Sequence, residues 1–116
     1  MVWEMVVKQE IQGQFELLYG PGGAWSKLFG KAPGFRGTTV LKDAHNPSRY
    51  LIIDVWDSEG QQAQAVSECA DEYAKLNAHL ENWTEARIEL GVFKVRTEAA
   101  VRPRGKPSRR NPRSSR

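Results

Sequence analysis

The segment Gly34–Glu59 constrains the fold of this chain more than any other. It holds two runs rich in β-branched and aromatic residues, Phe35–Lys42 and Arg49–Trp56, on either side of the turn-forming residues 43–48. Such runs around a cluster of Asp, Asn, Pro and Ser are typical of a β-hairpin. Ser58 follows directly, with a glutamine three residues later, which is the capping-box pattern of a helix start. The segment predicts a hairpin followed by a helix.

Helical periodicity flanks the hairpin on both sides. Residues 10–19 place apolar side chains on one face, and after the glycine-rich residues 20–23 the same spacing resumes up to Phe29. Two short helices that meet at a kink are therefore expected before the hairpin. After it, apolar residues recur in steps of four and three from Cys69 to Trp83, which predicts one long helix.

Two further strand-like segments, Val2–Lys8 and Val92–Arg96, complete the pattern. The order strand, helix, strand, strand, helix, strand predicts an α+β fold. It is that of a ferredoxin-like βαββαβ sandwich, with an antiparallel sheet and helices on one side.

The predicted strand Arg49–Trp56 is apolar on both of its faces. Alternation along the strand separates two sets of side chains: Leu51, Ile53 and Val55 on one face, and Tyr50, Ile52, Asp54 and Trp56 on the other. A sheet that is apolar on both faces is normally covered on both, and no predicted helix is left for the second face. We expect a homodimer in which two such sheets pack together.

Charge divides the chain into a domain, residues 1–96, and a tail, residues 97–116. The tail holds seven basic residues and one acidic residue, a net charge of +6, which leaves −3 for the domain out of the overall +3. With almost no apolar side chains the tail is expected to be disordered. It could make a weak, salt-dependent contact with a nucleic acid. A solvated extension is the favoured interpretation, because scattered charges carry no base-reading geometry.

Several classes of protein are disfavoured by composition. One cysteine, Cys69, excludes an intrachain disulfide, and with only two histidines it leaves no ligand set for zinc or another metal. No signal-peptide pattern and no run of roughly 20 apolar residues is present, so we expect a cytoplasmic protein without a membrane span.

Aromatic side chains and one acid are the candidates for function. Four tryptophans in so short a chain indicate either core packing or a pocket for a flat ligand between helices and sheet, with Trp25, Tyr73 and Phe29 as pocket candidates. Asp54 interrupts an apolar strand. If buried, it is either paired, for example with Arg36, or has a raised pKa that suits a general base.

Six sequence runs within residues 2–96 are similar to those of a known family: VWE in the first strand, FELLYGPGGAWSKLF (Phe15–Phe29), GFRGTTVLKD (Gly34–Asp43), RYLIIDVWDS (Arg49–Ser58), and EYAKL and ELGVFKV near the end. On these runs, residues 2–96 resemble the antibiotic biosynthesis monooxygenase family, whose members form dimeric α/β barrels. The resemblance is more specific for the fold than for the activity, because this fold supports many chemistries.

The resemblance implies an oxygenase that needs neither metal nor flavin. Such an enzyme deprotonates a small phenol or hydroquinone, and the resulting anion reduces O₂ directly. On residue type, Trp25, Tyr73 and Phe29 would form the aromatic box, Asp54 or His79 would be the base, and Arg36 would stabilise the developing oxyanion.

Haem chemistry, known in other members of the family, is disfavoured for this chain. The first strand offers Glu4 in place of the family's asparagine, and no tryptophan occurs between Trp56 and Trp83. No cofactor is therefore expected. A non-catalytic dimer that binds a small ligand or acts in stress, and a nucleic-acid contact through the tail, remain the alternatives.

Overall fold

The computed structural model describes residues 1–94, so the predicted tail 97–116 lies outside the described residues. Its elements follow the predicted order, with each helical segment divided in two. They are β1 (Val2–Val7), the short 3-10 helix η1 (Gln9–Ile11), α1 (Gln12–Tyr19), α2 (Ala24–Phe29), β2 (Phe35–Lys42), β3 (Arg49–Trp56), α3 (Glu59–Glu68), α4 (Ala70–Trp83) and β4 (Thr84–Gly91).

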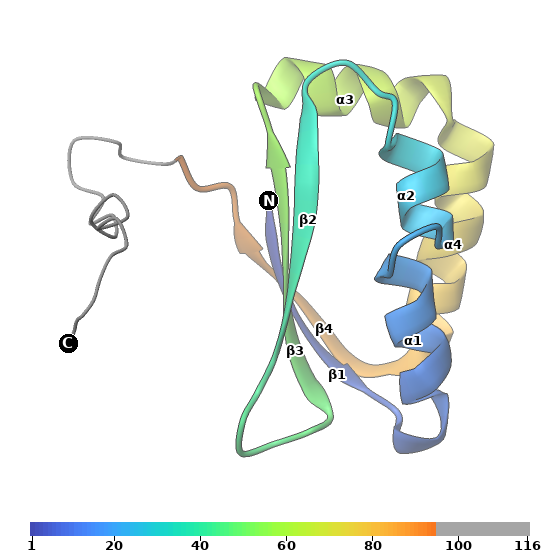
Figure 1. The fold of residues 1–116 in the computed structure, drawn as a ribbon, viewed down its shortest axis with the longest axis vertical. Helices are drawn as coiled ribbons and strands as arrows, with labels where there is room; N and C mark the ends of the chain where they lie inside the picture. Colours follow the sequence, from blue (N-terminus) through green and yellow to red (C-terminus); the bar gives the residue numbers. More distant parts are fainter. Residues whose placement is uncertain (95–116) are drawn as a thin grey trace, which may run out of the picture.

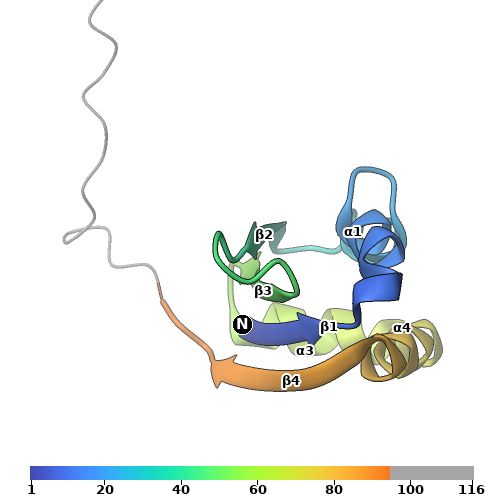
Figure 2. The same ribbon diagram turned by 90° about the horizontal axis from the view of Figure 1, so that it is seen from below.

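The four strands form one antiparallel sheet in the order β2-β3-β1-β4. Helices α1, α2 and α4 lie along one face of this sheet, and α3 runs across one end of it (Figures 1 and 2). The predicted ferredoxin-like α+β fold is thus confirmed. Among residues 1–94 no element covers the opposite face.

The hairpin and the helix start after it form as predicted, because their signals are local. The Asp43 carboxylate accepts hydrogen bonds from the backbone N–H groups of His45 and Asn46, at 2.7 and 3.1 Å, which closes the turn between β2 and β3. At the start of α3, the Ser58 hydroxyl accepts a hydrogen bond of 3.1 Å from the backbone N–H of Gln61.

The prediction for the last strand was wrong. The structure places it at Thr84–Gly91, directly after α4, and residues 92–94 follow it without regular structure. The backbone turns from helical to extended at Thr84 (φ −114°, ψ 146°), where no glycine or proline marks the change. The sequence TEARIEL then alternates with a period of two, and Arg87 lies opposite Met5 of β1.

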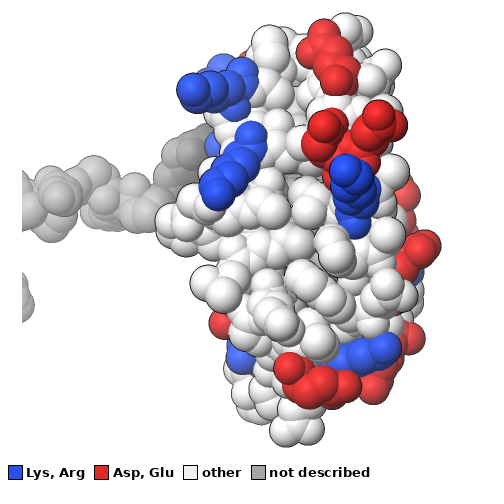
Figure 3. Space-filling model, turned by 90° about the vertical axis from the view of Figure 1, so that its right-hand side faces the viewer, with Lys and Arg blue, Asp and Glu red and all other residues white. Residues whose placement is uncertain are grey.

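The core lies between the sheet and the helices. Its fully buried side chains come from every layer: Met5, Val7, Phe15, Phe29, Tyr50, Ile52 and Leu80. The outer surface of the helical layer carries Lys, Arg, Asp and Glu side chains of mixed sign (Figure 3). That surface is typical of a helix face in contact with solvent.

The uncovered face of the sheet is apolar, as the alternation in Arg49–Trp56 predicted. Leu41, Ile88 and Leu90 are exposed by 48, 51 and 44 % in the single chain. One ion pair crosses this face, between Arg49 and Glu4 at 2.8 Å. Within residues 1–94, none of the helices has the length and apolar character needed to cross a bilayer.

Candidate functional site

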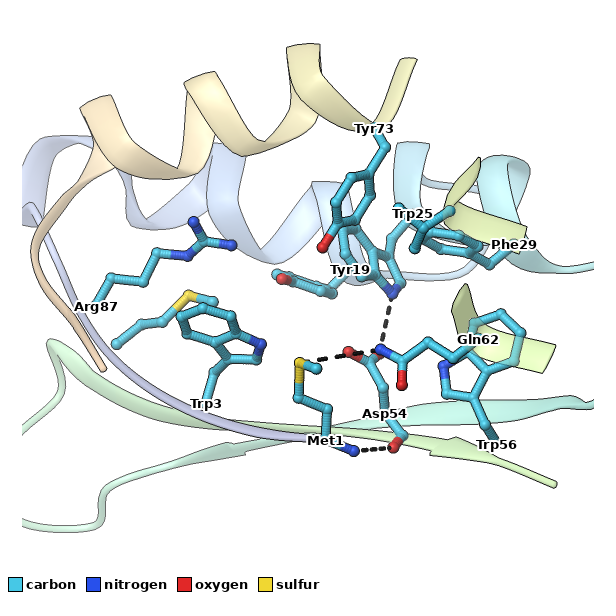
Figure 4. A pocket seen from close by; sticks show the side chains of 12 residues that line it. Met1, Trp3, Tyr19, Trp25, Phe29, Asp54, Trp56, Gln62, Tyr73 and Arg87 are labelled. Carbon is cyan, nitrogen blue, oxygen red and sulfur yellow. Dashed lines mark hydrogen bonds between the residues drawn. The ribbon is translucent and has the colours of Figure 1, made fainter. Parts of the chain in front are cut away.

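A cavity lies between the inner face of the sheet and the helices (Figure 4). It is lined by Met1, Trp3, Met5, Tyr19, Trp25, Phe29, Asp54, Trp56, Gln62, Val66, Tyr73 and Arg87. Its volume is about 10 Å³, enough for a single water molecule. The aromatic side chains thus pack against one another, and a larger ligand enters only if side chains move.

Asp54 is the one buried acidic residue among residues 1–94, with 6 % of its surface exposed. Its carboxylate oxygen Oδ1 accepts two hydrogen bonds, from the indole Nε1 of Trp25 at 3.0 Å and from the hydroxyl of Thr38 at 2.5 Å. Burial raises the pKa of Asp54, and the bonds from Thr38 and Trp25 act in the opposite direction. The carboxylate is thus held in place and made a stronger base than a free aspartate.

The predicted aromatic box assembles around Trp25. The ring centroids of Phe29 and Tyr73 lie 5.0 and 6.1 Å from that of Trp25, and Tyr19 lies 5.2 Å away on α1. Such tilted and edge-on contacts add to the stability of a core and fix the orientation of each ring. Trp25, Tyr73 and Phe29 therefore lie together near Asp54, and their role in binding a ligand stays a prediction.

Tyr19 contributes a neutral hydroxyl group to the cavity. Burial raises the pKa of Tyr19 far above its ordinary value, the charge of Asp54 raises it further, and the charge of Arg87 lowers it. The phenol therefore stays protonated throughout the physiological range and can donate a hydrogen bond to an anion.

Two of the predicted site residues lie elsewhere. Arg36 is exposed and forms an ion pair with Asp57, with Nε 2.6 Å from Oδ1, so the expected pair between Arg36 and Asp54 is not formed. His79 is exposed on α4 and stacks on Trp83, with ring centroids 5.4 Å apart. Since the next residue, Leu80, is fully buried, His79 is turned away from the cavity.

Arg87 replaces Arg36 as the cation of the site. Arg87 was not among the predicted site residues, because the last strand was predicted at Val92–Arg96 and not at Thr84–Gly91. The alternation in TEARIEL is the sequence signal that places Arg87 in a strand. Its guanidinium carbon lies 4.3 Å from the ring centroid of Trp3, and its Nη2 donates a hydrogen bond of 2.7 Å to the side-chain oxygen of Asn77.

A second, wider hollow of about 720 Å³ opens on the outer side of the sheet, beside the segment 92–94. Four residues line both this hollow and the inner cavity: Met1, Asp54, Trp56 and Gln62. The inner cavity and the outer hollow therefore adjoin at these four side chains, and two of them, Met1 and Gln62, are long and flexible.

A family model described as antibiotic biosynthesis monooxygenase matches residues 5–83, more than half of the chain. The chain belongs to the antibiotic biosynthesis monooxygenase family. Family membership supports a monooxygenase-like function in general terms. The sequence matches none of the curated proteins with which it was compared.

Solved structures of three other proteins show the same fold as this member of the antibiotic biosynthesis monooxygenase family. A conserved protein from Methanosarcina mazei Go1 is 20 % identical over 73 % of this chain and 79 % of its own, with a TM-score of 0.57. A candidate antibiotic biosynthesis monooxygenase from Nitrosomonas europaea is 16 % identical over 75 % and 80 % of the two chains, also at 0.57. A structure named antibiotic biosynthesis monooxygenase is 10 % identical over 80 % and 96 %, at 0.54. At these identities the likeness shows the fold alone.

Metal ligands do not cluster in the described part of the chain. Within residues 1–94 no group of three or more His, Cys, Asp and Glu side chains is arranged to hold a metal ion. The expectation of a site without a cofactor, with haem disfavoured, stays a prediction.

Replacing Trp25 by phenylalanine is expected to destabilise the protein by about 1–3 kcal/mol at neutral pH, because the variant keeps a ring but loses the hydrogen bond to the Asp54 carboxylate. Urea denaturation at two pH values measures the loss. It should shrink in acid, where Asp54 is protonated and the bond is weaker. The matched control is Trp83→Phe, since the indole N–H of Trp83 donates to no protein atom among residues 1–94. Equal losses for both variants would contradict the assigned hydrogen bond.

Proposed function

We propose that this protein is a cofactor-independent monooxygenase that acts on a small aromatic substrate with a phenolic hydroxyl group. The observation that carries the proposal is a buried carboxylate of raised pKa, Asp54, held inside a cavity walled by aromatic rings. Membership of the antibiotic biosynthesis monooxygenase family supports the same general activity.

In the proposed reaction, Asp54 takes the proton from the substrate hydroxyl. A base of raised pKa suits this task, because the proton then moves from the phenol to the carboxylate with a smaller loss of free energy. The electron-rich phenolate passes electrons to O₂, and a ring carbon forms a bond to one oxygen atom. The peroxide takes up a proton and loses water as the ring carbon gives up its hydrogen. The products are a quinone and one water molecule, which account for both atoms of O₂.

The cavity side chains support this chemistry by binding and by hydrogen bonding. Trp25, Phe29 and Tyr73 offer faces and edges for stacking against a flat ring. Tyr19, which burial keeps protonated, donates a hydrogen bond to the oxyanion as charge develops. Because the cavity holds only about one water molecule, a substrate of even one ring requires the aromatic side chains to move apart, in addition to the displacement of Met1 and Gln62 at the boundary with the outer hollow.

The proposal includes a homodimer formed through the uncovered face of the sheet. A domain of this size with exposed leucine, isoleucine and valine side chains on one sheet face gains stability by burying them against a second copy. The mixed charges of the helical surface leave the sheet as the apolar face for that contact (Figure 3).

Oxygen consumption with a panel of substituted hydroquinones and phenols tests the proposed activity. The purified protein, treated with a chelator, should consume O₂ faster than buffer with at least one member and should release the matching quinone, detected by its absorbance. Thermal stabilisation by the same compounds without O₂ uptake would instead indicate a non-catalytic binding protein. The absence of any uptake across the panel would overturn the proposal.

A further inference from the structure

Arg87 is a half-buried cation with one buried hydrogen-bond donor that is unused within residues 1–94. It extends from β4 across the inner face of the sheet, beside Met5. Trp3 packs against the plane of its guanidinium group, and Asn77 of α4 accepts a hydrogen bond from Nη2. Its Nε atom is fully buried and has no hydrogen-bond acceptor among residues 1–94. The ion pairs of this part of the chain involve Arg36, Lys42 and Arg49, and none involves Arg87.

Such an arrangement is unfavourable in the protein alone. A buried donor without an acceptor loses the hydrogen bonds that it made to water in the unfolded chain, and the Nε group of Arg87 is such a donor. Trp3 and Asn77 hold the guanidinium group in one orientation without neutralising it. An acceptor from outside the chain would remove the deficit.

The position of Arg87 indicates what that acceptor is. Figure 4 shows Arg87 at the left of the cavity and Asp54 near its centre, with Tyr19 and Trp3 drawn between the two. Arg87, Asp54 and Tyr19 all line the same small cavity. A ligand that enters here as the surrounding side chains move apart meets both a base, Asp54, and a cation, Arg87.

We propose that Arg87 anchors an anionic group of the ligand, so that the site selects a one-ring aromatic acid with a hydroxyl group. The carboxylate of the ligand accepts a hydrogen bond from Nε and neutralises the guanidinium group, while its hydroxyl group lies toward Asp54. This inference rests on the site of the proposed function and deepens it by naming the substrate class. A neutral phenol would leave the Nε atom without an acceptor.

Binding of two matched compounds tests the inference without any turnover. Titration calorimetry under nitrogen at pH 7 compares para-hydroxybenzoate with its neutral isostere para-hydroxybenzamide. The wild-type protein should bind the acid about 10- to 100-fold more tightly, the usual effect of one hydrogen bond to a charged group. Arg87→Gln should remove this preference without weakening the binding of the amide. Arg36→Gln is the matched control, because Arg36 is exposed and paired with Asp57, and it should leave the preference unchanged.

Three results would overturn the inference. They are equal affinity of the wild-type protein for acid and amide, an unchanged preference in Arg87→Gln, and failure of both compounds to bind at millimolar concentration. In the last case the Nε atom would remain a buried donor without an acceptor among residues 1–94. If Arg87→Gln does not give a cooperative thermal transition, the neutral variant Arg87→Met serves instead, and a preference equal to that of the wild type refutes the anchor. Acid-selective binding without O₂ uptake would refute the proposed oxygenase activity and would leave the proposed role of Arg87 in binding intact.

Discussion

Replacing Asp54 by asparagine is expected to lower the rate of O₂ consumption by about 10²- to 10⁴-fold, the usual contribution of a general base. Asparagine has nearly the same shape and retains an oxygen that accepts from Trp25 and Thr38, so the cavity should keep its form. It cannot take a proton from a phenol at neutral pH. Steady-state rates on the best substrate of the panel measure the loss.

The same variant should be more stable than the wild type at pH 7. Burial raises the pKa of Asp54 above its ordinary value of 3.8, so the ionised carboxylate is less favourable in the folded than in the unfolded chain. The stability that the neutral acid provides is fully present below that ordinary value and is lost as pH rises through the raised pKa. The asparagine side chain of the variant stays neutral, so the melting temperature of Asp54→Asn should exceed that of the wild type at pH 7, and the gap should close toward pH 4.

Asp57→Asn is the matched control for Asp54→Asn. Asp57 is exposed and its ion pair with Arg36 lies on the surface, so this change should alter stability by less than about 1 kcal/mol and leave the rate unchanged. A wild-type rate in Asp54→Asn would remove Asp54 from the role of base. A lower melting temperature at pH 7 would show that the ionised carboxylate stabilises the fold through its two hydrogen bonds.

The parts of this fold that follow from sequence are those with local causes. The bounds of β2 and β3 agree with the prediction because β-branched alternation ends at an aspartate that closes its own turn, Asp43. The burial of Asp54 follows from the same alternation, since its neighbours on that face, Tyr50 and Ile52, are buried as well.

The remainder of the site depends on contacts between distant segments. Trp25 and Thr38 come from α2 and β2, and nothing in the local pattern around Asp54 identifies them as its hydrogen-bond donors. Arg36, in contrast, was predicted to pair with Asp54 and does not. Arg36 is exposed at a register irregularity between Phe35 and Gly37. Its ion-pair partner is Asp57 and not Asp54. The position of Arg87 follows only once the helix is known to end at Trp83, a boundary without glycine or proline.

The largest expected effect on assembly comes from Ile88→Lys. Ile88 is half exposed on the uncovered sheet face, in the central part of β4 and opposite Glu4 of β1. In a single chain the new ammonium group lies in water beside a carboxylate, so the monomer tolerates it. In a twofold symmetric dimer formed through this face, two such groups would be buried at once.

Burying a poorly paired polar group costs about 1–3 kcal/mol in proteins, so the two lysines should weaken the dimer by on the order of 10²- to 10⁴-fold. Sedimentation velocity at micromolar concentration should show a dimer for the wild type and a monomer for Ile88→Lys. Leu17→Lys is the matched control: Leu17 is 73 % exposed on α1, in the helical layer, and the same charge there should leave the dimer intact. A wild-type monomer, or an Ile88→Lys variant that sediments as a dimer, would show that the sheet face is not the contact. A dimer lost through Leu17→Lys would move the contact to the helices.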